Sequence, residues 1–194
     1  MIDSKLEKTL LNFFKKLDEE NIEIYNEFSF QHELGIYLRS FFYNNFKVQF
    51  ERNISFFDIE KENMEKKEMD ICVFDNDKEK KCCIELKFPR NGQIPEQMYS
   101  FCKDIKFLEQ LVEKGFSRGY FLAIIEEKSY FEIKSRSKNE IYKIFRENKI
   151  IEGTIKKPTG NSKKKLNIKG RYPIKWVKMK KGRYYLLIKI EETI

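Results

Sequence analysis

The chain has 194 residues, 41% of them hydrophobic and 36% charged, with a formal net charge of +8, four cysteines and a single histidine. Its longest apolar run is six residues, against roughly 20 for a membrane helix, and its start lacks the basic-then-apolar leader of a secreted protein, so we expect a cytoplasmic protein without a membrane partner. The cysteines form no CxxC pair, which excludes a zinc module, and any Ser-His-Asp triad would have to use His32.

The first 126 residues show helical and strand patterns in a definite order. Apolar residues recur at helical spacing over residues 5–19 and again after Ser29, which we expect to be the N-cap of a helix to Tyr43. Three short strand patterns follow, and Pro95 then opens a helix that Gly115 ends. A continuous apolar run completes the order α-α-β-β-β-α-β. The expected strands are residues 47–57, 69–74, 81–88 and 119–126, and the third helix covers residues 95–114.

The rest of the chain is rich in short strand patterns. We expect a short helix over residues 139–147, two strands around a polar loop at 158–162, and a hairpin that turns at residues 180–183. These strands either extend the main sheet or form a small β appendage. We therefore divide the chain into a core of residues 1–130 and a β-rich region of residues 131–194 that packs on it.

The positive charge is concentrated in this C-terminal region. Twelve Lys or Arg residues and no Asp or Glu lie between Gly153 and Arg183, which leaves the remainder of the chain net acidic. Clustered cations favour a nucleic-acid partner, because their binding releases condensed counterions; a solvated lysine-rich surface is the alternative. The lysines that we expect to contact nucleic acid are Lys163, Lys164 and Lys165.

Three charged residues stand in two consecutive apolar strands: Asp70 in the first, and Glu85 and Lys87 in the second. A buried charge is costly unless it is paired or bound to a metal. A hairpin turn centred between Asp77 and Lys78 places Asp70 opposite Glu85, and the period of two puts Lys87 on the same face. Two carboxylates that close repel unless a divalent cation lies between them. Hard oxygen ligands at this spacing suit Mg²⁺.

Lys87 has two interpretations. Beside a metal ion, its ammonium orients or deprotonates the attacking water and offsets charge on the phosphate. In the same hairpin register, however, Lys87 faces Glu68. The alternative is therefore a simple cross-strand ion pair.

The pattern of Asp70 followed by Glu85-Leu86-Lys87, within this order of elements, resembles the PD-(D/E)XK nuclease superfamily, which includes restriction endonucleases, resolvases and RecB-like exonucleases. The resemblance covers roughly residues 29–126. It implies an α/β, restriction-endonuclease-like core with a mixed sheet flanked by helices, here followed by a basic β-rich extension. It also implies that Asp70 and Glu85 are ligands of Mg²⁺ or Mn²⁺, with Lys87 at the scissile phosphate.

The resemblance suggests further positions. The family often adds an acid from the helix before the first core strand, and Glu33 matches it; the alternative is an acid that interacts favourably with the helix dipole. Met69 stands where a proline is common, and Gln97 is followed after four residues by Phe101 rather than tyrosine, unlike the exonuclease branch. The segment after the third strand either contacts nucleic acid or is a connecting loop. Its expected contact residues are Arg90, Gln93 and Gln97.

The resemblance implies a metal-dependent nuclease that hydrolyses DNA phosphodiester bonds by attack of a metal-bound water. An endonuclease of restriction, repair or mobile-element biology is the expected type. Because two cuts in a duplex usually need two active sites, we expect a homodimer. One alternative is a catalytically inert nuclease-like module for DNA binding or assembly. Another is a protein-interaction subunit whose basic region meets an acidic protein.

Overall fold

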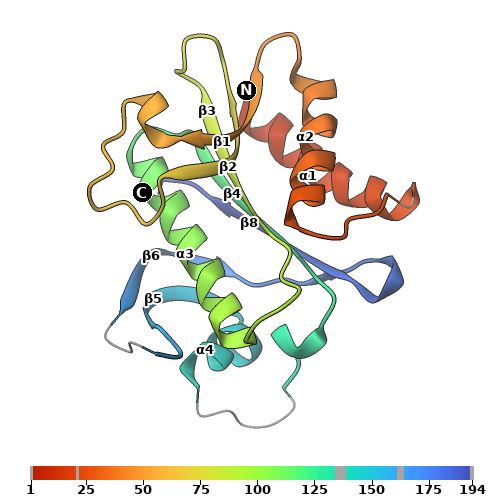
Figure 1. Ribbon diagram of the computed structural model, residues 1–194, viewed down its shortest axis with the longest axis vertical. Helices are drawn as coiled ribbons and strands as arrows, with labels where there is room; N and C mark the ends of the chain where they lie inside the picture. The colour runs from red at the N-terminus through yellow and green to blue at the C-terminus, as the bar shows by residue number, and fades with distance from the viewer. Residues whose placement is uncertain (1, 21, 134–138, 161–163, 193–194) are drawn as a thin grey trace.

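The computed structural model describes residues 2–20, 22–133, 139–160 and 164–192. Two N-terminal helices precede the strands, and a long third helix separates the first three strands from the others (Figure 1). The helices are α1 (Ile2–Glu19), α2 (Glu27–Phe42), α3 (Ile94–Glu113) and α4 (Glu140–Tyr142), with helical turns η1 (Ile54–Phe57), η2 (Lys128–Tyr130), η3 (Lys143–Asn148) and η4 (Lys180–Gly182). The strands are β1 (Lys47–Asn53), β2 (Glu68–Phe74), β3 (Lys81–Lys87), β4 (Arg118–Ile125), β5 (Ile150–Lys156), β6 (Lys165–Pro173), β7 (Val177–Lys178) and β8 (Tyr184–Ile190).

Six strands form a mixed sheet in the order β1-β2-β3-β4-β8-β7. Strands β3 and β4 run parallel because α3 connects them as a crossover, and the other neighbouring pairs are antiparallel. Helices α1 and α2 lie on one side of this sheet and α3 lies on the other (Figure 1). The prediction of an α/β chain with a mixed sheet flanked by helices is therefore confirmed.

Both faces of strand β4 are covered, which explains its uninterrupted apolar sequence. Leu122 and Ile124 belong to the core packed under α1 and α2, whereas Phe121 and Ala123 belong to the core packed under α3. Successive side chains of a strand point to opposite faces, so a strand between two helical layers needs apolar residues at every position.

The hairpin of β2 and β3 has the register predicted from its turn. Ile71 pairs with Ile84, and the backbone N–H of Asp75 donates to the carbonyl of Lys80 at 3.0 Å to close the loop. Lys78 occupies the left-handed region of backbone space, at φ 61°, where a non-glycine residue is tolerated mainly in turns. The two strands therefore meet in the register that makes Asp70 and Glu85 neighbours.

Helix α2 begins earlier than the sequence pattern predicted. Its N-cap is Asn26, whose Oδ1 accepts from the backbone N–H of Ser29 at 2.7 Å, while Ser29 Oγ accepts from the backbone N–H of Asn26 at 3.0 Å. This reciprocal pair is a capping box, so Ser29 is the third helical residue and not the cap. The earlier start brings Glu27 into the first turn of the helix.

Strand β1 also differs from its expected extent. It ends at Asn53, whose Oδ1 accepts from the backbone N–H of Ser55 at 3.1 Å and caps the turn η1. The side chain of Asn53 thus satisfies a backbone donor that a continued strand would leave for pairing.

The C-terminal region adopts both of the arrangements that the sequence left open. Strand β8 pairs antiparallel with β4, and the short β7 pairs with β8, so the last hairpin extends the main sheet. Strands β5 and β6 form a separate two-stranded sheet, and their buried residues join the core on the α3 side. The basic region therefore packs directly on the helix that carries part of the candidate site.

The four cysteines are free and buried. Within the ranges that the structure describes, no helix has both the length and the apolar character required to cross a membrane.

Candidate active site

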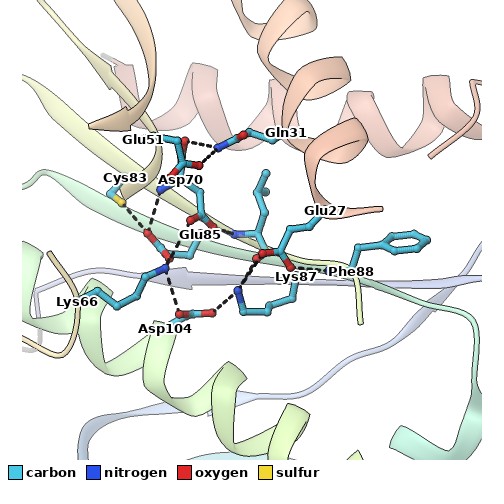
Figure 2. A network of polar contacts seen from close by, with 11 residues as sticks. Glu27, Gln31, Glu51, Lys66, Asp70, Cys83, Glu85, Lys87, Phe88 and Asp104 are labelled. Atoms are coloured by element: carbon cyan, nitrogen blue, oxygen red, sulfur yellow. Dashed lines mark hydrogen bonds and ion pairs between the residues drawn. The ribbon is translucent and has the colours of Figure 1, made fainter. Parts of the chain in front are cut away.

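Asp70 and Glu85 lie side by side on neighbouring strands (Figure 2). The backbone N–H of Asp70 donates to Glu85 Oε1 at 3.3 Å, and Asp70 Oδ2 accepts from the backbone N–H of Leu86 at 2.7 Å. Glu85 lies two residues from Cys83, which belongs to the core under α3, so its side chain faces that helix. The carboxylate of Glu85 is fully buried, and that of Asp70 is 16% exposed.

A lysine that the sequence did not suggest stands between these carboxylates. Lys66 belongs to the segment between η1 and β2, and its Nζ forms an ion pair with Glu85 Oε2. The same Nζ lies 3.4 Å from Asp70 Oδ1 and 3.4 Å from Oδ1 of Asp104, a buried residue of α3 (Figure 2). Three carboxylates from three different elements therefore converge on one ammonium group.

Lys87 completes the cluster on its other side. Its Nζ lies 3.1 Å from Asp104 Oδ2 and 3.3 Å from Glu27 Oε1, and Glu27 Oε2 accepts from the backbone N–H of Phe88 at 3.1 Å. Glu27 is in the first turn of α2, so it reaches the end of β3 from the helix N-terminus (Figure 2). Asp104 thus links the two lysines, one on each carboxylate oxygen. The alternative ion pair between Lys87 and Glu68 is replaced by these contacts.

The two lysines keep their charge in this environment. Burial disfavours the ammonium of Lys66, but the carboxylates of Glu85, Asp104 and Asp70 outweigh burial and raise its pKa. Burial acts against the ammonium of Lys87 as well, and Asp104 and Glu27 again raise its pKa above the ordinary value. Both side chains are therefore fixed positive charges at neutral pH.

The buried acids are affected in the opposite sense. Burial is the main reason why the pKa of Glu85 lies well above its usual range, and the negative charge of Asp70 raises it further, against the opposing effect of Lys66. Burial also raises the pKa of Asp104, although Lys87 and Lys66 partly offset it. Burial therefore favours the neutral form of both acids, whereas the two lysines favour the charged form.

Glu33 was expected at this site, but its described contact is with His32 and not with the cluster, so its catalytic role stays a prediction. Its carboxylate lies 3.5 Å from His32 Nδ1, on a different side of α2 from the residues that contact the site. Glu27 and Gln31 share a face because they are four residues apart, and Gln31 Nε2 donates to the carbonyl of Asp70 at 2.8 Å and to Glu51 Oε1 at 2.6 Å. Two further residues along the helix, the chain has rotated about 200°, which turns Glu33 away.

The segment after β3 leaves the site toward α3. Arg90 is exposed, and its Nη1 donates to the carbonyl of Tyr25 at 2.7 Å. Gln93 is the exposed N-cap of α3, and Gln97 Nε2 donates to the carbonyl of Asn91 at 2.8 Å. None of these three side chains joins the described contacts of the cluster, so a role in nucleic-acid contact stays a prediction.

A basic hollow lies beside α3. It has a volume of about 620 Å³ between the first half of α3, the segment that carries Lys66 and the β5–β6 sheet. Lys164 and Lys165 line it, whereas Lys163 lies outside the described residues, and the expected contact of these lysines with nucleic acid stays a prediction. Its lining residues are Glu65, Glu96, Tyr99, Ser100, Lys103, Lys157, Lys164, Lys165 and Leu166.

A smaller hollow of about 80 Å³ opens next to Asp70. Phe28, at the start of α2, contributes an aromatic side chain that is 75% exposed to its rim. The hollow borders two residues of the cluster, Glu27 and Asp70. Its lining residues are Glu27, Phe28, Gln31, Glu51, Asp70 and Leu86.

The carboxylate oxygens of Asp70 and Glu85 are of the type that binds hard divalent cations. No group of three or more His, Cys, Asp or Glu side chains in the described part of the chain is arranged to hold a metal ion. However, Asp70 Oδ1 and Glu85 Oε2 already converge on a single positive atom, the Nζ of Lys66. Two carboxylate oxygens are a sufficient protein contribution for Mg²⁺, which usually completes its coordination with water and substrate phosphate.

Sequence reasoning missed three residues of the cluster, and they differ in whether a sequence feature could have pointed to them. Asp104 interrupts the apolar stripe of α3 between Phe101 and Leu108, so its position in the pattern was a usable signal. Glu27 could have been proposed only if Asn26 had been recognised as the N-cap of α2. Lys66 had no signal, because it lies among exposed charged residues.

Comparison with known proteins adds no relative: no protein-family model, no curated protein and no solved structure matches the chain.

Proposed function

We propose that this chain is a metal-dependent nuclease with a restriction-endonuclease-like core that hydrolyses phosphodiester bonds in DNA. The observation that carries the proposal is the pairing of Asp70 and Glu85 on adjacent antiparallel strands, with Lys87 on the same side of the sheet. The mixed sheet with helices on both sides is compatible with that family.

Each residue of the cluster has a chemical task in this proposal. The carboxylates of Asp70 and Glu85 would hold the divalent ion, and the backbone N–H of Leu86 fixes the orientation of Asp70 by donating to Oδ2. When bound, the ion supplies Lewis-acid polarisation of the phosphate and lowers the pKa of water. The ammonium of Lys87 offsets negative charge that develops on the phosphate.

Asp104 and Glu27 act through Lys87 as positioning residues. They hold its Nζ at 3.1 Å and 3.3 Å and raise its pKa, so the group stays charged and fixed in direction. A preorganised charge costs no reorganisation when the transition state forms. The same arrangement explains why a lysine tolerates burial at this position.

The basic hollow supplies the contact with the polynucleotide backbone. Lys157, Lys164 and Lys165 line it, next to the half of α3 that leads to Asp104. Lysines bind phosphate without reading the base sequence, so this surface contributes affinity and orientation. Arg90 and Gln93 extend the proposed contact beyond the end of β3.

Cleavage of plasmid DNA with MgCl₂ or MnCl₂ tests the proposal. Asp70→Ala removes a metal ligand and Lys87→Ala removes the charge at the phosphate, so we expect each rate to fall on the order of 10²–10³-fold. Glu33→Ala is the matched control, because it removes an acid of α2 that lies away from the cluster. It should cleave at the wild-type rate.

The nuclease assignment fails if the wild type and the variants of Asp70 and Lys87 have the same activity. In that case the cleavage comes from a contaminant.

The second candidate is an inert nuclease-like module that binds DNA or organises an assembly. One observation favours it: Lys66 occupies the position between the two acids, and an ammonium there balances part of their charge without any metal. Salt-dependent DNA binding without cleavage, unaffected by Glu85→Ala, would support this function over the first.

A further inference from the structure

Lys66 provides the positive charge at the centre of the cluster. Its Nζ contacts one oxygen each of Asp70, Glu85 and Asp104 (Figure 2). Two of these oxygens belong to Asp70 and Glu85, the residues to which the proposed function assigns a divalent ion. A metal ion and this ammonium therefore compete for the same oxygens.

The charges of the cluster favour the ion with the higher charge. Four carboxylates, those of Glu27, Asp70, Glu85 and Asp104, face only two ammonium groups. Each carboxylate has an ammonium partner, but the cluster holds two more carboxylates than ammonium groups. Because attraction between charges grows with their product and with burial, a doubly charged ion between Asp70 and Glu85 compensates the acids better than Lys66 does.

The side chain of Lys66 can move out of the cluster because of its position in the chain. The residues around it are largely exposed, and its own side chain is 25% exposed on a flexible four-carbon stem. The backbone on the N-terminal side of Lys66 is held independently of the cluster. Gln110 of α3 accepts from the backbone N–H of Glu65 at 2.9 Å and donates to the carbonyl of Asn63 at 2.7 Å.

We propose that Lys66 is a built-in counter-cation that occupies the metal position of the proposed nuclease and is displaced when the divalent ion binds. This inference rests on the proposed function for the identity of the two metal ligands. Lys66 holds the acids together before the metal arrives, and it sets the metal affinity, since each binding event must release it. The acids are therefore kept in place at the expense of weaker metal binding.

Titration calorimetry with MnCl₂ tests the competition. Lys66→Met removes the competing charge and keeps the apolar stem, so the variant should bind Mn²⁺ at least roughly tenfold more tightly than the wild type. Lys67→Met is the matched control, because Lys67 is exposed in the same segment, and its affinity should equal that of the wild type. Asp70→Asn should abolish Mn²⁺ binding both in the wild type and in combination with Lys66→Met.

A second measurement uses the unaltered protein and so does not depend on the folding of a variant. Lysine amines of the wild type are acetylated with and without MgCl₂, and peptide mass spectrometry reports the extent at each site. We expect acetylation of Lys66 to rise several-fold with MgCl₂, because the displaced amine becomes exposed. Acetylation of Lys67 should not change.

The outcomes separate this inference from the nuclease proposal. If wild type and Lys66→Met bind Mn²⁺ equally, or if MgCl₂ leaves Lys66 as protected as before, displacement is refuted even when cleavage depends on Asp70. If the affinity and acetylation results are as expected but no nucleic acid is cleaved, displacement stands and the nuclease proposal fails. If no form of the folded protein binds Mn²⁺, both are overturned.

Discussion

Glu85 illustrates how a single buried charge depends on its neighbours. Its Oε2 contacts Lys66, while its Oε1 accepts from the backbone N–H of Asp70 and from the Cys83 thiol, whose Sγ lies 3.7 Å away. The thiol can donate only while it is protonated. Burial, reinforced by the negative charge of Glu85, raises the pKa of Cys83 well above its ordinary value. The same side chain thus carries a costly charge and keeps a neighbouring thiol neutral.

The buried thiols should resist alkylation over a wide pH range. Burial raises the pKa of Cys72 to about 12 and also raises the pKa of Cys102, and only the thiolate reacts. We expect the folded protein to incorporate little iodoacetamide between about pH 7 and pH 9.5, where a free thiol of pKa roughly 8.5 ionises. Mass spectrometry after urea unfolding should show four modified cysteines.

The raised pKa of these thiols also makes the stability of the folded protein depend on pH. An unfolded thiol loses its proton at a lower pH than the folded one, so these thiols contribute stability that is present below the unfolded pKa and lost as the pH rises above it. Rapid modification of a thiol in the native protein would show that the core around that residue opens easily.

At the scale of elements, Glu109 joins α3 to strand β6. Its Oε1 accepts from the backbone N–H of Gly170 at 2.7 Å and from the Tyr172 hydroxyl at 3.1 Å, and the backbone N–H of Lys169 also donates to it at 2.9 Å. Lys106 Nζ lies 3.2 Å from the other oxygen. This one carboxylate ties the small β5–β6 sheet to the helix that carries Asp104. The basic hollow depends on the same junction, because the helix and the small sheet form two of its walls.

Glu109→Gln should lower the free energy of unfolding by about 2–3 kcal/mol, since the amide cannot satisfy these donors and hydrogen bonds to a charged group are stronger. Urea denaturation measures the change. Glu113→Gln is the matched control on the same helix: its exposed ion pair with Lys169, at 2.8 Å, is screened by solvent and should contribute little to stability. Equal losses from the two variants would contradict a special role for Glu109.

At the scale of the whole molecule, charge is segregated between the two parts of the chain. The acids of the candidate site lie where β2, β3, α2 and α3 meet, whereas the β5–β6 sheet on the α3 side contributes lysines to the large hollow (Figure 1). Opposite charges that adjoin in this way can attract a polyanion to one surface while a cation is held at the next. In the nuclease that we propose, the two features together would offer one extended surface to a phosphate backbone.

Reversing two charges of the hollow should weaken nucleic-acid binding in a salt-dependent manner. For Lys164→Glu with Lys165→Glu, we expect the slope of log affinity against log salt to fall by about 2, because each lost phosphate contact removes roughly 0.9. Fluorescence anisotropy with labelled duplex DNA at several salt concentrations measures it. The control reverses Lys8 and Lys47, which are exposed on α1 and β1; an equal change there would mean that only net charge matters.

The sequence alone determined the local part of the site. The alternation of β2 and β3 and the residues of their turn fix the register, so the neighbourhood of Asp70 and Glu85 and the side of Lys87 could be predicted. Strand periodicity is encoded within a few residues. The same patterns predicted the order of helices and strands in the first 126 residues.

Only the tertiary structure decided which other charges reach those acids. The acid of α2 that contacts the cluster is Glu27, in the first turn of the helix, and not Glu33. Packing of α3 on the sheet brings Asp104 against Lys66 and Lys87. These contacts join residues far apart in the chain, and local periodicity carries no information about their distance. An exposed-looking lysine became the centre of the cluster because three separate elements placed their carboxylates around it.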